Sequence, residues 1–80
     1  MTIGEAVKER LLELCDQHHI TINRLSTISG ITQSTLNNIV SGRNHSTTIS
    51  TIQKVCDGLE ISIIEFFQSD LFLDLEQELK

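Results

Sequence analysis

Apolar residues recur along this 80-residue chain at intervals of three and four, the spacing that places side chains on one face of an α-helix. These intervals predict an amphipathic helix over residues 3–18 and shorter helices over 22–29 and 33–41. A fourth helix is expected to begin after Thr47 or Thr48, either of which can cap it. Its apolar positions are Ile49, Ile52, Val55 and Cys56.

The C-terminal part of the chain contains two further start signals for helices. Ser62 and Glu65 have the spacing of a capping box, which predicts a fifth helix directly after Ser62. After Ser69 and Asp70, leucines recur at every fourth position, so a sixth helix at the C-terminus is an open alternative. These leucines are Leu71, Leu75 and Leu79.

No stretch of the chain has the alternating pattern of a β-strand. We therefore expect an all-α fold. Eighty residues suffice for one domain with a modest core, so residues 1–80 are expected to form a single domain.

A short turn is expected between the second and third helices. Thr21 can cap the helix over 22–29, and Gly30 can end it, since helices commonly end at a residue with positive φ. Thr32 can then cap the next helix. Two helices joined by a short turn that contains Gly, here residues 21–41, form a helix-turn-helix, whose second helix enters the major groove of DNA.

The second of these helices has one polar face and one apolar face. With about 100° per residue, one side spans roughly 140° and carries only amides and hydroxyls. Its residues are Gln33, Ser34, Asn37, Asn38 and Ser41, and the opposite side carries Leu36, Ile39 and Val40. Amides and hydroxyls can hydrogen-bond the edges of bases. Because a merely solvated face usually carries charged residues, this composition favours DNA recognition.

The chain resembles the Cro/phage-repressor (Xre-type) helix-turn-helix family. The matching residues are Ile20, Thr21, Leu25, the run 30–36, Ile39, Gly42, Ile49, Ile52 and the run 59–62. The resemblance implies a compact five-helix repressor-like domain that binds double-stranded DNA. It also implies that the helix 33–41 contacts bases and that the loop after Gly42 runs beside the DNA backbone.

The pattern and the resemblance together give a set of expected DNA-contacting residues. They are Thr32, Gln33, Ser34, Thr35, Asn37, Asn38, Arg43 and Asn44. Gln33 lies in the first turn of the helix, at the centre of the polar face. Arg43 is the expected phosphate ligand in the loop, and the role of His45 stays open.

Two departures from the family pattern change the picture. The resembled family commonly begins the second helix with a Gln that touches a phosphate, whereas this chain has Ile22, which is either a core residue or an exposed apolar one. The family also often has a buried Arg–Glu pair at the positions of Cys15 and Val40. Replacing both charged residues is tolerable, because no unpaired charge then remains buried. Cys15 and Val40 are therefore expected to be buried and close together.

The net charge of −5 argues at first against a nucleic-acid partner. The charge is unevenly distributed, however: residues 1–18 carry −2, residues 19–58 carry +2, and residues 59–80 carry −5. The part of the chain that contains the helix-turn-helix, residues 19–58, is thus mildly basic. Its three cations can neutralise few phosphates, which points to weak binding or to a dimer.

Several other classes of site are not expected. Cys15 and Cys56 lie in apolar helical contexts and should be buried and reduced. The adjacent His18 and His19 diverge on a helix and have no third ligand nearby, so we expect no metal and no cofactor. The chain shows no arrangement of catalytic residues, so it is not expected to be an enzyme.

The location follows from absences in the sequence. No apolar run is long enough to span a membrane, and no signal peptide is present. We therefore expect a cytoplasmic protein that has no membrane partner and no evident small-molecule ligand.

These observations lead to one functional hypothesis and one alternative. The hypothesis is a sequence-specific DNA-binding transcriptional regulator, a repressor, that inserts the helix 33–41 into the major groove as a homodimer. Residues 62–80 are the expected dimerisation segment, because their apolar residues exceed what a five-helix domain needs. The alternative is a protein-interaction module with a helix-turn-helix fold, for example one that binds a toxin or another regulator.

Overall fold

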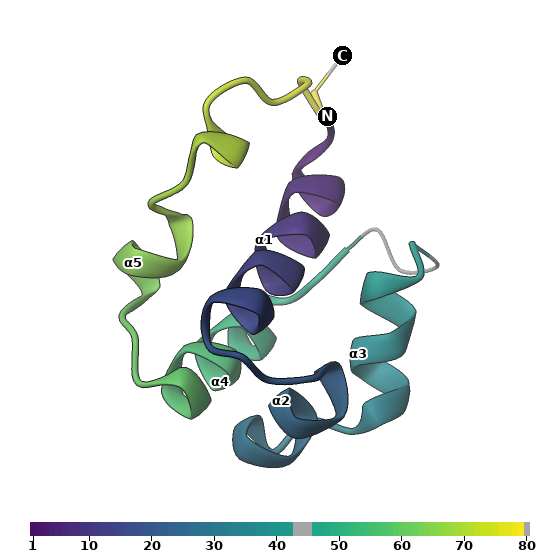
Figure 1. The fold of residues 1–80 in the computed structure, drawn as a ribbon. Helices are drawn as coiled ribbons and strands as arrows, with labels where there is room; N and C mark the ends of the chain where they lie inside the picture. Colours follow the sequence, from purple (N-terminus) through teal and green to yellow (C-terminus); the bar gives the residue numbers. More distant parts are fainter. Residues whose placement is uncertain (43–45, 80) are drawn as a thin grey trace.

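The computed structural model describes residues 1–42 and 46–79 of the chain, and over these residues it is helical without strands. The elements are α1 (Ile3–Gln17), α2 (Ile22–Ser29), α3 (Gln33–Val40), α4 (Ile49–Leu59), α5 (Ile63–Phe67) and a 3₁₀ turn, η1 (Asp70–Phe72). In Figure 1, α3 lies on one side of α1, while α5 and the C-terminal segment lie on the other. The expected all-α fold is confirmed.

Each α-helix begins after a hydroxyl side chain that accepts a hydrogen bond from the backbone N–H three residues later. The capping residues are Thr2, Thr21, Thr32, Thr48 and Ser62. Such a bond satisfies one of the backbone donors that a helix start leaves without a partner. This repeated signal explains why the helix starts expected from the sequence agree with the structure, and Thr48 rather than Thr47 caps α4.

The core lies among all five α-helices: α2 packs most extensively on α4, α3 packs on both α1 and α2, and α5 packs on α4. Its largest fully buried side chains are Phe66, Leu11, Leu25, Leu36, Ile39, Val55 and Cys56. Each of the five α-helices contributes at least one buried apolar residue, which ties the short helices to the long one. Ile22, whose place was open, is half-buried and packs against this core.

The helices α2 and α4 approach each other closely at Gly58. A Cβ atom at this position would lie 2.7 Å from Ser29 Oγ and 2.9 Å from the backbone O of Ile28. These distances are too short for non-bonded atoms, so only glycine fits. The Ser29 hydroxyl is itself buried and has no hydrogen-bond partner within the described ranges.

Arg10 joins α1 to the end of α5. Its side chain is 8% exposed, and its Nε donates to the backbone O of Phe66 at 2.7 Å. Its terminal nitrogens bond the backbone O of Glu65 and the carboxylate of Glu13. The guanidinium thus donates to two carbonyls at the end of α5, and the carbonyl of Phe66 has no other partner among the described residues, whereas that of Glu65 also accepts the backbone N–H of Gln68.

The C-terminal segment does not form the sixth α-helix that the leucine spacing suggested. It forms the single turn η1, which packs on α1, and then continues without helix to residue 79. The backbone N–H of Glu76 donates to the backbone O of Met1 at 3.1 Å, so the segment runs back to the start of the chain. The ring of Phe72 contacts that of Phe67 edge to face and lies tilted against that of Phe66, which uses part of the surplus apolar surface within the domain.

The expected burial of Cys15 and Val40 is half right. Cys15 is buried at 5% exposure on α1. Val40 is only half-buried, because it is the last residue of α3, where the helix gives way to the loop. The family resemblance implied an interior position here, but α3 ends at this residue.

Candidate nucleic-acid interface

The turn between α2 and α3 is held by the backbone of α2. Gly30 adopts the left-handed conformation, with φ 66° and ψ 28°, and its N–H donates to the backbone O of Ser26. The N–H of Ile31 donates to the same oxygen at 3.1 Å, and the Ile31 side chain packs against the core. This arrangement fixes the direction in which α3 leaves the turn.

The two faces of α3 differ as the helical wheel predicts. Leu36 and Ile39 are buried in the core, at 0% and 2% exposure. The polar side chains on the other face are exposed, and none makes a hydrogen bond within the part of the chain that the structure describes. They are Gln33, Ser34, Asn37 and Asn38. Their donors and acceptors are therefore available to a ligand.

Thr32 and Thr35 have structural partners at the start of α3. Thr32 Oγ1 accepts the backbone N–H of Thr35 at 3.2 Å, and the two hydroxyl oxygens are 2.9 Å apart. Thr32 is exposed and Thr35 is half-buried. Both side chains therefore shape the beginning of the helix beside Gln33, whatever they contact outside the protein.

The loop residues Arg43, Asn44 and His45 lie outside the described residues. The loop begins at Gly42, whose φ of 80° is a conformation that side chains other than glycine's rarely adopt. The structure therefore brings together the expected residues of α3 and gives the starting point of the loop.

The charge around α3 suits an anionic partner. Residues 21–42 contain no Asp or Glu, and their one cation is Arg24 in the first turn of α2. The acidic C-terminal segment lies across α1 from α3 (Figure 1). The helix-turn-helix itself therefore offers a polyanion amides, hydroxyls and one cation, and no carboxylate.

The sequence patterns assign no role to Arg10 or Arg24. Arg10 is buried and bonded, so it is not available to a ligand. Arg24 is exposed. Its position in the sequence is the signal that could have identified it as functional, because helices favour acidic rather than basic residues in the first turn.

Other kinds of site find little support in the described residues. Within them, no group of three or more His, Cys, Asp or Glu side chains is placed to hold a metal ion. None of the helices described is long and apolar enough to cross a membrane.

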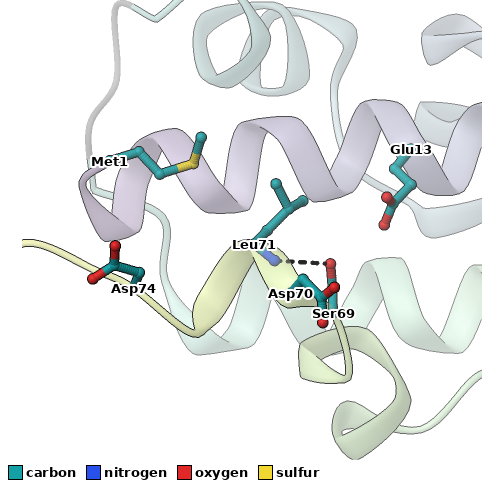
Figure 2. A pocket seen from close by; sticks show the side chains of 6 residues that line it. All are labelled: Met1, Glu13, Ser69, Asp70, Leu71 and Asp74. Atoms are coloured by element: carbon teal, nitrogen blue, oxygen red, sulfur yellow. Dashed lines mark hydrogen bonds between the residues drawn. The ribbon is translucent and has the colours of Figure 1, made fainter.

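An open hollow of about 470 Å³ lies between α1 and the C-terminal segment. Figure 2 shows Leu71 in this hollow, with the carboxylates of Asp70 and Asp74 on the C-terminal segment and that of Glu13 on α1. Its acidic lining makes it a poor site for nucleic acid.

Comparisons with known proteins agree with this arrangement. The crystal structure of the prophage Lp1 protein 11 superposes with a TM-score of 0.79 and 47% sequence identity, over 88% of this chain and 92% of that one. No curated protein matches the chain significantly. The profile of the Cro/C1-type HTH DNA-binding domain matches residues 10–69, which include all five α-helices in whole or in part. The chain therefore belongs to the Cro/C1-type HTH DNA-binding domain family.

Proposed function

We propose that this DNA-binding protein is a sequence-specific transcriptional repressor that occupies its operator as a homodimer in the cytoplasm. The observation that carries the proposal is the exposed face of α3, where four amide and hydroxyl side chains have no partner within the described residues. Bound in the major groove, such groups would discriminate bases by hydrogen bonding. The family is typically non-enzymatic, and the proposal assigns no catalysis.

Within this proposal the residues have different roles. The first turn of α3 enters the groove, so Gln33 is assigned to base recognition, supported by Ser34, Asn37 and Asn38. Thr32 and Thr35 are assigned to the phosphates beside the groove. Arg43 and Asn44 keep the backbone contacts that the sequence suggested.

The proposed function is tested by selecting bound sequences from a random pool of duplex DNA. A regulator of this kind should enrich a two-fold symmetric site, with half-sites about one helical turn apart. Placing the selected site between a promoter and a reporter gene then separates repression from activation. Failure to enrich any sequence would contradict sequence-specific binding.

The homodimer is supported by apolar side chains that the monomer leaves exposed near its C-terminus. Ile64 on α5 is 78% exposed and Leu73 after η1 is 80% exposed. Leu71 and Leu75 beside them are half-buried, so they contribute less free surface than the sequence suggested. A contact between two copies would remove these side chains from water.

The same surface favours a second candidate, a module that binds another protein. Apolar side chains with acidic neighbours such as Asp70 and Asp74 suit a partner with a basic, partly apolar surface. Salt-sensitive retention on heparin or on non-specific DNA distinguishes the two candidates. A DNA-binding repressor is retained and is released as salt increases, whereas a pure protein-binding module with net charge −5 passes through.

A further inference from the structure

Arg24 is an exposed cation in the first turn of α2. Its backbone N–H donates to Thr21 Oγ1 at 3.1 Å, which forms the helix cap. Its guanidinium makes no ion pair with any carboxylate in the described ranges. The backbone of Arg24 is thus engaged, while its charge has no counterpart there.

The position of this cation opposes the stability of α2. The N-terminal end of a helix is the positive end of its dipole, so an acidic side chain is favoured there and a basic one is disfavoured. In α1 the equivalent position is Glu5, which completes a reciprocal capping box with Thr2. In α2 the cap is the same, but Arg24 stands in place of the acid. The stability of α2 therefore does not explain why a basic residue occupies this position.

The other cations of the described residues are placed differently. Arg10 is buried and bonded to α5 and Glu13. Lys8 is half-buried on α1, and Lys54 is exposed on α4. Beside Arg24, Ile22 packs against the core and has no polar group with which to bind a phosphate. Within the described residues of the helix-turn-helix, Arg24 is thus the one exposed basic side chain.

We propose that Arg24 binds a phosphate of the DNA backbone and so helps to hold α3 in register in the groove. The inference rests on the proposed DNA-binding function and adds a residue that lies outside α3 and the loop after it. In helix-turn-helix proteins the first helix crosses the DNA backbone, which brings its side chains near phosphates. A phosphate at this place would pair with the guanidinium and also with the positive end of the α2 dipole.

The test compares the salt dependence of DNA binding in the unmodified chain with that of Arg24→Ala. Loss of one phosphate contact per subunit should reduce the slope of log K against log salt concentration by about 0.9. At about 0.1 M salt this corresponds to roughly eightfold weaker binding per subunit, on selected and random sequences alike. Arg24→Lys should restore most of the slope, because it restores the charge.

Two controls keep the result specific. Lys54→Ala removes the same charge from α4 and should leave the slope unchanged. The thermal midpoint of Arg24→Ala should not fall, since the substitution removes a cation that opposes the helix dipole.

An unchanged slope for Arg24→Ala, with DNA binding otherwise intact, would overturn this inference and leave the proposed function standing. Equal losses in Arg24→Ala and Lys54→Ala would also overturn it, because the effect would then belong to the overall charge. If the unmodified chain shows no salt-dependent DNA binding, the inference and the proposed function both fail.

Discussion

At the scale of single residues, Gln33 carries the most specific expectation. Its side chain is exposed in the first turn of α3, where a helix of this kind enters the groove. We expect Gln33→Ala to weaken binding to the selected site by about 1–3 kcal/mol and to relax the preference at one base pair per half-site. The measurement is a titration of each variant with the selected site and with random DNA. Equal losses on both would assign Gln33 to backbone support.

Gly58 and Ser29 test the close contact between α2 and α4. Gly58→Ala should destabilise the fold by about 1–3 kcal/mol, because the added methyl group meets the Ser29 hydroxyl and the rigid backbone of Ile28. Ser29→Ala is the matched control. It removes a buried hydroxyl that has no partner within the described ranges and should leave stability unchanged or raise it.

Denaturant unfolding measures both variants. A Gly58→Ala variant as stable as the unmodified chain would show that the two helices can separate at little cost.

The two thiols predict how stability depends on pH. Burial raises the pKa of Cys15 above its ordinary value of 9.0, and burial together with the nearby Asp57 carboxylate raises the pKa of Cys56. Below about pH 9 both thiols are protonated whether the chain is folded or not. Above it the unfolded chain loses protons first, so stability should fall as pH rises.

Chemical unfolding at a series of pH values from 7 to above 9 measures this effect. The control is the variant Cys15→Ala with Cys56→Ala, whose alkaline loss should be smaller. An equal loss in both proteins would assign the effect to other groups.

At the scale of elements, Arg10 determines whether α5 stays attached. Arg10→Met keeps the apolar stem but leaves the carbonyls of Glu65 and Phe66 without these donors. We expect a loss of about 1–3 kcal/mol, the cost of leaving the Phe66 carbonyl unsatisfied, because the Glu65 carbonyl keeps the backbone N–H of Gln68. Hydrogen exchange should accelerate more in α5 than in α2. A uniform acceleration across the chain would show that α5 is not a separate unit.

The sequence predicted the helix starts well, and the reason is local. Thr21, Thr32 and Ser62 cap their helices through bonds to residues three positions away, and such signals can be read from neighbouring letters. The polar and apolar faces of α3 follow from the same short-range periodicity. The polar face of α3, which is the main part of the candidate site, could therefore be predicted from the sequence.

The sequence could not predict features that depend on distant contacts. From the sequence alone, Arg10 would be a solvated residue of α1. Its role depends on Phe66, which is 56 residues later in the chain and accepts its hydrogen bond in the fold. The leucine spacing after Ser69 suggested a helix, but a helix that short gains little from its own hydrogen bonds. Packing of η1 on α1 and the bond from Glu76 to Met1 hold the segment in another form.

At the scale of the whole molecule, the separation of charge reconciles an acidic protein with a polyanionic partner. Residues 59–80 carry −5, and α5 with the described segment that follows it lies across α1 from α3 (Figure 1). Exposed charges separated by more than about 8–10 Å are largely screened at ordinary salt concentrations. The acidic segment therefore opposes DNA binding less than the net charge suggests.

The dimensions of the molecule bear on the proposed dimer. Its extents are 37 × 24 × 20 Å, so two copies in contact can place their α3 helices about 34–36 Å apart, which is one turn of DNA. A dimer would also double the phosphate contacts of a domain with few cations. We therefore expect the unmodified chain to sediment as a dimer at micromolar concentration.

Ile64→Asp and Leu73→Asp test this dimer at positions where the side chain is free. Both residues are largely exposed in the monomer, so the substitutions should leave the fold intact and yield a monomer that binds the operator weakly. Ile49→Asp is the control, because Ile49 is 67% exposed but lies at the start of α4 rather than in the C-terminal segment. Sedimentation and circular dichroism separate loss of the dimer from loss of the fold. An unmodified chain that is monomeric yet binds its operator tightly would contradict the dimer, because a single copy would then be making all of the contacts that the binding requires.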